Sequence, residues 1–213
     1  MTQIDTIVFD LGGVLFDVDY HKTSKAFNDL GIDVNKAAYA QQHQSRHFDD
    51  LEIGKLSEHD FLMQLSTLSR DGTTTDQVKQ AWNAMLVGFP QRRRALLERV
   101  KKNYRLLLLS NTNSIHEAAF KKMIETTFGH YWFDSVFDKV YLSHHIGKRK
   151  PNHETFEYVN KDAQLNKTST LFIDDSVQHA VGALKYGWHA IHLKVAAGEE
   201  VAKLFDANGK LKE

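Results

Sequence analysis

The sequence contains no cysteine, which excludes disulfide bonds, thiolate zinc sites and thiol nucleophiles. Proline is nearly as scarce, and its two residues, Pro90 and Pro151, lie outside the segments with helical patterning. The longest apolar runs, such as residues 106–109, fall far short of the ~20 residues needed to span a bilayer. The first residues also lack the basic and then apolar layout of a signal peptide. These absences favour a cytoplasmic protein that does not enter a membrane.

An excess of charge of one sign is missing as well. The 27 Lys and Arg residues balance the 27 Asp and Glu residues, and no basic block stands out. The electrostatic footprint of a protein that binds nucleic acid or an anionic membrane is therefore absent, and neither is an expected partner. The 12 His residues are scattered without the spacing of a metal-binding motif. With 213 residues, the chain can form one large domain or a core domain with a smaller insertion.

Five short runs rich in Leu or β-branched residues end beside small or polar residues, as buried parallel strands do. They cover residues 6–9, 106–109, 136–142, 171–173 and 190–193. Helical patterns begin at Ser114, Asn152 and Ser176, and Gly187 ends the last of them. Because strands and helices alternate, the sequence predicts an α/β fold with a Rossmann-like core built on a parallel sheet.

Residues 19–87 break this alternation, since they contain several amphipathic helical segments and no convincing strand. Helices are expected over residues 57–68, opened by Ser57, and over residues 76–86. We therefore expect a helical cap subdomain at residues 19–87, inserted into a core formed by residues 1–18 and 88–213. The arginines at 92–94 indicate a solvated helix start, and the tail after Gly198 indicates a loosely packed helix.

Four polar segments sit where predicted strands end, which is where open α/β sheets bind ligands. They are residues 9–14 (FDLGGV), 109–113 (LSNTN), 147–151 (GKRKP) and 172–176 (FIDDS). Each alone is a weak signal, because Asp or Ser after a strand often only caps a helix or forms a turn. Together they supply a carboxylate, a hydroxyl donor, a fixed cation and a second acidic cluster. That set fits phosphate and magnesium.

In this order, the four segments resemble the signature motifs of the haloacid dehalogenase superfamily, and the helical insertion resembles the cap between its first two motifs. The resemblance covers essentially the whole chain. The four runs are most similar to those of bacterial sugar-phosphate phosphatases of the alpha-D-glucose-1-phosphate phosphatase type. The resemblance therefore implies a hydrolase that acts on a small phosphorylated metabolite, such as a sugar phosphate.

In such an enzyme Asp10 attacks phosphorus and forms an aspartyl-phosphate, which splits one difficult hydrolysis into two easier steps. A carboxylate that approaches a phosphate is repelled, and a shared Mg2+ removes most of this penalty. The cofactor is therefore expected to be Mg2+. The metal ligands that the resemblance implies are the carboxylates of Asp10, Asp174 and Asp175 and the backbone carbonyl of Gly12. Asp174 binds the ion either directly or through water.

Substrate binding is expected from the second and third segments. The hydroxyl of Ser110 and the amide of Asn111, at a helix N-terminus, would bind phosphoryl oxygens. Lys150 would add a positive charge that holds the nucleophile and the phosphate together. The family pattern places the catalytic lysine directly before proline, which selects Lys150 over Lys148. Lys148 and Arg149 are then expected to be exposed.

The sequence departs from the family pattern at the proton donor. Many phosphatases of the superfamily carry an acidic residue two positions after the nucleophile, and here that position is Gly12. The glucose-1-phosphate type also has Gly there, so the chemistry would rely on a good leaving group, such as an anomeric phosphate, or on another proton donor. Polar residues near or within the cap offer alternatives, although each is explained as simply by a solvated position: Asp17, Asp19, His43 and His47. Residues 42–48, with Arg46, are a candidate for reading the substrate, and an exposed helix face explains them as well.

Two rival functions remain open. Hydrolytic dehalogenases of the superfamily also lack the second acid and attack carbon without a metal. The adjacent Asp174 and Asp175 weigh against this, because clustered carboxylates without a cation repel one another. The second rival is a regulator that binds a phosphorylated metabolite and has lost turnover. A further departure is His179, where the related pattern often has Asn, which affects local hydrogen bonds rather than the metal. The sequence predicts neither the physiological substrate nor the oligomeric state.

Overall fold

The structure, a computed structural model, describes residues 3–33 and 46–212. Its centre is a five-stranded parallel sheet in the order β5-β4-β1-β6-β7. The strands are β1 (Thr6–Phe9), β4 (Arg105–Ser110), β5 (Lys139–Leu142), β6 (Thr170–Asp174) and β7 (His189–His192). The predicted α/β fold with a parallel, Rossmann-like core is therefore confirmed. The first strand of the chain lies in the middle of the sheet.

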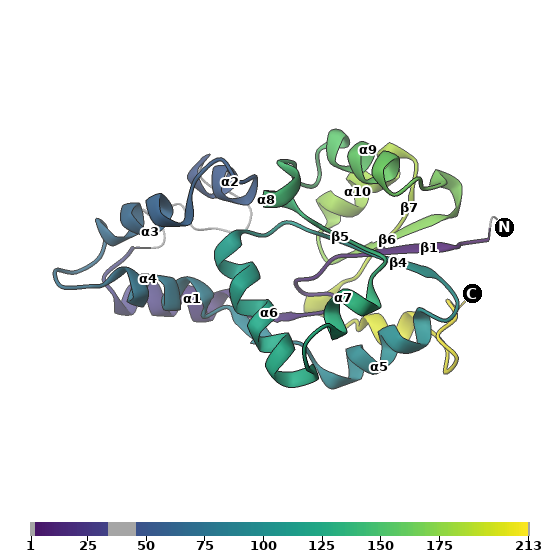
Figure 1. Cartoon of the computed structure of the whole chain (residues 1–213), viewed down its shortest axis with the longest axis horizontal. Coiled ribbons are helices and arrows are strands. Elements are labelled where there is room, and N and C mark those ends of the chain that lie inside the picture. Colours follow the sequence, from purple (N-terminus) through teal and green to yellow (C-terminus); the bar gives the residue numbers. More distant parts are fainter. Residues whose placement is uncertain (1–2, 34–45, 213) are drawn as a thin grey trace.

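Helices cover both faces of the sheet, as Figure 1 shows. Successive residues of β4 point to opposite faces, so that Leu106 and Leu108 join one buried cluster and Leu107 and Leu109 join another. Burial on both faces explains why this strand is an unbroken run of Leu. The helices against the first face are α5 (Gln91–Val100), α6 (Ser114–Phe128) and α7 (Trp132–Val136), and those against the second are α9 (His153–Asp162) and α10 (Val177–Tyr186).

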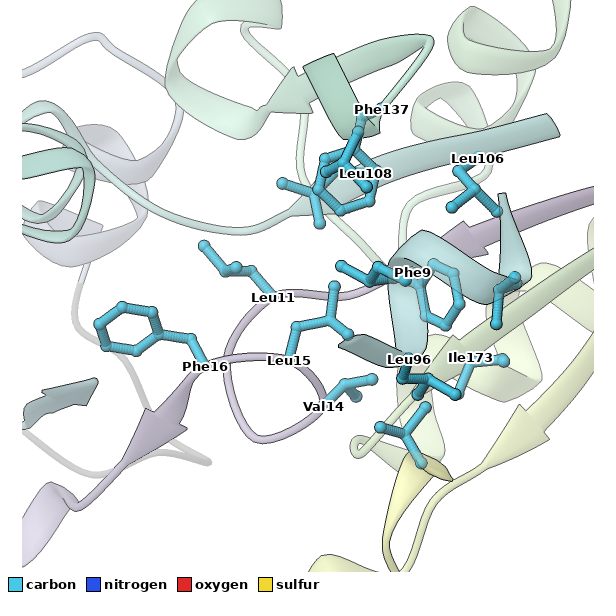
Figure 2. Packing of buried hydrophobic residues seen from close by; sticks show 14 of the residues in the cluster. Phe9, Leu11, Val14, Leu15, Phe16, Leu96, Leu106, Leu108, Phe137 and Ile173 are labelled. Carbon is cyan, nitrogen blue, oxygen red and sulfur yellow. The ribbon is translucent and has the colours of Figure 1, made fainter. Parts of the chain in front are cut away.

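The loop after β1 is held in place by the first buried cluster. Leu11, Val14, Leu15 and Phe16 all belong to this cluster, and Figure 2 shows Val14 and Leu15 pointing towards the side of Phe9 and Phe16 pointing the other way. The amides of Leu15 and Phe16 both donate to the carbonyl of Leu11 at 2.8 Å, which closes the turn. This turn therefore fixes the position of Asp10, which follows Phe9 at the end of the central strand.

A helical insertion, α1–α4, extends beyond the ends of the strands, away from the two chain termini (Figure 1). Its helices are α1 (Tyr20–Asp29), α2 (Arg46–Glu52), α3 (Glu58–Ser66) and α4 (Thr75–Asn83). They bury a cluster of their own, in which the ring of Trp82 contacts the rings of Phe27 and Phe61. Ser57 caps α3, accepting the Asp60 amide at 3.0 Å, as its sequence predicts. Only Ile115, from α6, joins this cluster from the described part of the core.

A short antiparallel ribbon joins the insertion to the sheet. It consists of β2 (Asp17–Val18) and β3 (Leu86–Gly88), with Val18 opposite Leu86. The expectation of no strand within residues 19–87 is therefore wrong at its end. The apolar Leu86 follows the pattern of α4, but it leaves the helix to pair with Val18.

Three local expectations differ from the structure. The strand expected over residues 136–142 begins only at Lys139, because Trp132, Phe133 and Val136 form the turn of α7 that packs on the sheet. Arg93 is buried rather than solvated, with Nη1 2.7 Å from Asp17 Oδ1 and Nη2 3.0 Å from Glu200 Oε1.

The tail after Gly198 is also better packed than expected. It forms the 3-10 turn η3 (Val201–Leu204), and Val201 and Phe205 are buried in the first cluster. Two further 3-10 turns are η1 (Lys167–Ser169) and η2 (Val195–Ala197), and the short helix α8 (Ser143–Ile146) follows β5. Among the helices of the described ranges, none has the length and apolar character that a bilayer crossing requires.

Candidate active site

The sheet brings three of the four polar segments to one edge. Asp10 follows β1, Ser110 ends β4 and Asp174 ends β6, and β4 and β6 are the two neighbours of β1. In the register, Phe9 lies opposite both Leu108 and Ile173. Because parallel strands end at the same edge, side chains that follow them in sequence converge there.

Lys150, from the third segment, lies at the centre of this edge. Its side chain is fully buried, and Nζ lies 2.7 Å from Asp10 Oδ1 and 2.7 Å from Asp174 Oδ2. Asn111 fixes the backbone of Lys150 from both sides. Its Nδ2 donates to the Lys150 carbonyl and its Oδ1 accepts from the Lys150 amide, each at 2.9 Å. The side chain of Asn111 therefore positions the lysine. Helix α6 begins at Ser114, as expected, and its N-cap is Asn113, so Asn111 lies two residues before the cap.

Asp175 completes an acidic cluster with Asp10 and Asp174. One carboxylate oxygen from each of the three lies within 4.8 Å of those of the other two. An added Cβ at Gly13 would come within 2.2 Å of Asp175 Oδ2, so Gly13 leaves room for this carboxylate. We refer to Asp10, Lys150, Asp174 and Asp175 as the base cluster.

Burial and mutual repulsion control the protonation of the base cluster. Burial raises the pKa of Asp10 to about 7, although the ammonium of Lys150 opposes the rise. Burial, together with the charge of Asp174, also raises the pKa of Asp175 to about 6. Burial acts on Asp174 in the same sense, but Lys150 and His179 outweigh it and hold the pKa of Asp174 below its ordinary range.

The base cluster has the composition of a site for a hard divalent cation. Its three carboxylates outnumber its one ammonium, so negative charge is left uncompensated. Mg2+ prefers oxygen ligands of this kind, and it would relieve the repulsion that raises the two pKa values. Gly12 lines the same cavity as Asp10 and Asp175, as expected of a residue near the ion. The donor set therefore fits Mg2+.

A cavity of about 340 Å³ opens above the base cluster. Asp10, Ser110 and Lys150 line it on the side of the sheet, and Asp49 and Glu52 line it from α2 of the insertion. The expected substrate-binding residues Ser110, Asn111 and Lys150 all border this one cavity. Its walls are therefore built by both parts of the molecule, and they are mostly polar.

Arg149 is the main site residue that the sequence did not identify. It was expected to be exposed, but its guanidinium forms ion pairs with Asp49 and, at 3.0 Å from Nε, with Glu52 Oε2. We refer to Asp49, Glu52 and Arg149 as the roof cluster, because they line the cavity where the insertion meets the core. Asp49 and Glu52 are three residues apart and so share a face of α2, which is the one sequence signal for this pair. Lys148 is half-buried rather than exposed.

The other candidate proton donors fall outside the cavity or outside the described residues. Asp19 caps α1 by accepting from the amide of His21 at 3.0 Å, and Asp17 pairs with Arg93. His43 lies outside the described residues, as do the side chains of Arg46 and His47, and their expected roles stay predictions. His179 does line the cavity, and its Nδ1 lies 3.0 Å from Asp174 Oδ1. His179, where the sequence departs from the family pattern, therefore contacts a carboxylate of the base cluster directly.

Two phosphatases are similar in sequence to this chain. The chain is 35% identical over 173 residues to D-ribitol-5-phosphate phosphatase of Bacteroides thetaiotaomicron, covering 81% of this chain and 84% of that protein. It is 29% identical over 197 residues to sesquiterpene phosphatase astK of Aspergillus oryzae, covering 90% and 91%.

A solved structure resembles the whole fold. The wild-type haloacid dehalogenase family enzyme of Bacteroides thetaiotaomicron in complex with magnesium and inorganic phosphate superposes with a TM-score of 0.81 at 28% identity, covering 95% of this chain and 100% of that one. The sequence also matches the model of the haloacid dehalogenase-like hydrolases over residues 4–187. In agreement with the resemblance of its four motifs, the chain belongs to the haloacid dehalogenase-like hydrolase family.

Proposed function

We propose that this protein is a Mg2+-dependent phosphatase that hydrolyses small, polyhydroxylated phosphate monoesters through an aspartyl-phosphate on Asp10. The observation that carries the proposal is the buried ammonium of Lys150, which joins Asp10 to Asp174 at the floor of a polar cavity. In this proposal residues 19–87 form the cap over a core of residues 1–18 and 88–213. The family membership and the phosphatases among the relatives support it.

In the first step, a carboxylate oxygen of Asp10 attacks phosphorus while the bond between phosphorus and the alcohol oxygen breaks. The leaving oxygen takes a proton from water, because Gly12 supplies no acid, and becomes the alcohol. Water then attacks phosphorus of the aspartyl-phosphate, which releases inorganic phosphate and restores the carboxylate of Asp10. The hydroxyl of Ser110 and the charge of Lys150 stabilise the phosphoryl oxygens during both steps.

Asp10, Asp174, Asp175 and the Gly12 carbonyl are the residues that would hold Mg2+. When bound, the ion supplies positive charge between the nucleophile and the phosphate. The oxygens of Asp174 already accept from Lys150 at 2.7 Å and from the Ser176 amide at 2.8 Å. Asp174 therefore also serves to hold Lys150 in place, which is consistent with contact to the ion either directly or through water.

The cavity lining supports a sugar or sugar-alcohol phosphate as substrate. The roof cluster presents two carboxylates and a guanidinium to the part of the substrate that lies beyond the phosphate. Hydroxyl groups can hydrogen-bond to these side chains, whereas a terpenoid chain would leave them desolvated. The lining thus favours a substrate like that of the ribitol-5-phosphate relative over one like that of the sesquiterpene relative.

Glucose 1-phosphate and ribitol 5-phosphate make different demands on the site. The leaving group of glucose 1-phosphate is an anomeric oxygen, which departs more easily than the primary alcohol of ribitol. Because Gly12 supplies no acid, the anomeric phosphate suits the chemistry better. The relative with 35% identity instead favours ribitol 5-phosphate, the phosphate of a primary alcohol. Both belong in the substrate panel.

The proposal is tested by phosphate release from these two substrates. We expect turnover that is abolished by EDTA, restored by Mg2+, and lowered at least about 1,000-fold in kcat by Asp10→Asn. The matched control is Asp19→Asn, because Asn caps a helix as well as Asp and Asp19 lies outside the cavity lining. Its activity should equal that of the wild type.

The rival functions predict different results from the same protein preparations. Halide release from 2-haloacids without added metal would identify a dehalogenase, and the crowding of three carboxylates in the base cluster weighs against it. Binding of a phosphorylated metabolite without turnover across a broad panel would identify a regulator. Either result would replace the proposal.

A further inference from the structure

A cluster of one carboxylate and two imidazoles lies apart from the cavity, where α6 and α8 meet. Glu117 is in the first turn of α6, and His144 and His145 are adjacent in α8. The Nε2 atoms of His144 and His145 each lie 2.9 Å from the same atom, Glu117 Oε2. None of the three lines the cavity above the base cluster. Two imidazoles from neighbouring residues thus converge on a single oxygen.

Hydrogen bonds beside this cluster hold the starts of the two helices together. The hydroxyl of Ser143, the first residue of α8, accepts from the amide of Thr112 and donates to its carbonyl, both at 2.9 Å. Thr112 lies in the loop that leads into α6, so the starts of both helices are tied to each other. The side chains of His144 and Glu117 are only 7% and 13% exposed. The ligating atoms are therefore positioned in advance.

The geometry and the chemistry match a transition-metal site. The three atoms lie within 4.8 Å of one another. In a tetrahedral site, bonds of about 2.0–2.2 Å from Zn2+ to imidazole nitrogen and carboxylate oxygen place neighbouring ligand atoms about 3.3–3.6 Å apart. The two distances from imidazole Nε2 to Glu117 Oε2, at 2.9 Å, need only a small outward movement to reach this spacing. Two His and one Glu form a ligand set that Zn2+ uses, whereas Mg2+ favours oxygen alone.

One cation already contacts the cluster. Nζ of Lys121 lies 2.8 Å from Glu117 Oε1, the oxygen that faces away from the two imidazoles. The side chain of Lys121 is 40% exposed, so it can turn to solvent when an ion binds. The cluster also lies where the insertion contacts the core. Because an added Cβ at Gly54 would lie 2.5 Å from the His144 carbonyl oxygen, the insertion packs directly on α8 here.

We propose that Glu117, His144 and His145 form a second metal site, which binds a transition-metal ion of the Zn2+ type at the junction of the insertion and the core. The side chain of His145 is 57% exposed, so the site is accessible from solvent on this side. The site is independent of the base cluster and of the proposed phosphatase reaction.

The test is calorimetric titration with Zn2+ in the presence of excess Mg2+, which occupies the base cluster. We expect one Zn2+ per chain, with the dissociation constant raised at least about tenfold by His145→Ala. The matched control is His130→Ala. His130 also pairs with a glutamate of α6, its Nδ1 3.4 Å from Glu125 Oε1, but no second imidazole is part of that pair. This control should bind Zn2+ as the wild type does.

Co2+ provides a second readout that does not depend on activity. We expect the wild type to give a visible absorption band of Co2+ with nitrogen ligands, and Glu117→Gln and His145→Ala to lose it. Asp175→Asn should keep the band, which separates this site from the base cluster. Equal Zn2+ affinity in the wild type and His145→Ala, or a Co2+ band abolished by Asp175→Asn, would overturn the proposal. Phosphate release by the wild type can fail or succeed without affecting either result.

Discussion

Arg149 and Lys150 are neighbours in the chain, yet each holds a pair of carboxylates in a different setting. The side chain of Lys150 is fully buried, and its partners Asp10 and Asp174 follow or end strands of the sheet. The side chain of Arg149 is 25% exposed, and its partners come from one helix of the insertion. The sheet thus sets the base cluster through its strand order, whereas the roof cluster exists only where the insertion meets the core. We therefore expect the core alone to carry the chemistry and the junction of the insertion and the core to select the substrate.

Among the variants that compare the two clusters, the one that removes the charge of Lys150 should have the largest effect. In Lys150→Met the carboxylates of Asp10 and Asp174 lose their buried partner, which costs about 3–5 kcal/mol of folding free energy. The phosphate also loses a fixed cation, so kcat/KM should fall at least about 100-fold. Urea unfolding and steady-state phosphate release measure the two effects.

The control for this prediction is Lys148→Met, two residues earlier, in a half-buried position outside the cavity lining. It should change stability by less than about 0.5 kcal/mol and leave kcat/KM unaltered. If Lys150→Met kept the stability and the activity of the wild type, the buried ion pairs would not be the basis of the site.

The base cluster should also make the stability of the metal-free protein depend on pH. Folded Asp10, with its pKa raised to about 7, keeps a proton that the unfolded chain releases near its ordinary pKa of about 3.9. The folded state then binds more protons between these values, so its stability falls as the pH rises from about 4 towards 7. Mg2+ replaces the proton and should raise Tm more at about pH 8 than at about pH 5.

Thermal unfolding with EDTA or Mg2+ at the two pH values tests this dependence. Asp49→Asn alters the roof cluster alone, so it should keep the difference between the two Mg2+-induced shifts. A shift of equal size at both pH values would contradict the protonation that we assign to Asp10.

The difference between the two clusters also explains how far the sequence predicts the structure. The strand expected at residues 6–9 is observed as Thr6–Phe9, and the run at 106–109 lies within Arg105–Ser110. Such strands are readable because burial on both faces leaves an apolar run that ends at a polar residue. Asp10 and Asp174 follow from the same pattern, since strand order brings the ends of parallel strands together. Lys150 follows instead from the family resemblance, which places the catalytic lysine directly before proline.

The roof cluster could not be predicted in this way. Asp49 and Glu52 lie about one hundred residues before Arg149 and in a different part of the fold, and no periodicity or spacing links them. In the sequence, Arg149 stands next to Lys148, and both are expected to be charged side chains exposed to solvent. The role of Asn111 was only partly predicted for a similar reason, because its contacts with the Lys150 backbone depend on how two distant loops pack.

Loss of the roof arginine should weaken substrate binding rather than the chemical step. In Arg149→Gln the carboxylates of Asp49 and Glu52 would face an anionic substrate without their guanidinium partner. We expect KM to rise about tenfold with kcat changed by less than about threefold, the pattern of lost uniform binding. Stability should change by at most about 1 kcal/mol, because the ion pairs are partly exposed.

Arg94→Gln is the matched control for the roof. Arg94 pairs with Glu98 within α5, its Nε 2.8 Å from Oε1, and both lie outside the cavity lining. Its KM should equal that of the wild type. A fall in kcat with unchanged KM in Arg149→Gln would instead place Arg149 in the chemistry and remove the distinction between the two clusters.

The smallest effect is expected at Gly12, which lines the cavity that both clusters share. An added Cβ there meets only Val18 Cγ2 at 3.5 Å, an ordinary contact, so the Cβ of Gly12→Asp fits without displacing its surroundings. If the base cluster lacks a proton donor, the added carboxyl group should raise kcat on an alkyl phosphate about threefold more than on an aryl phosphate, whose alcohol needs no proton to leave. Gly12→Asn has the same size without the acid and should show no such preference. Equal changes on both substrates would mean that the alcohol already receives its proton from elsewhere, and the cavity residues of the insertion would then be the next place to search.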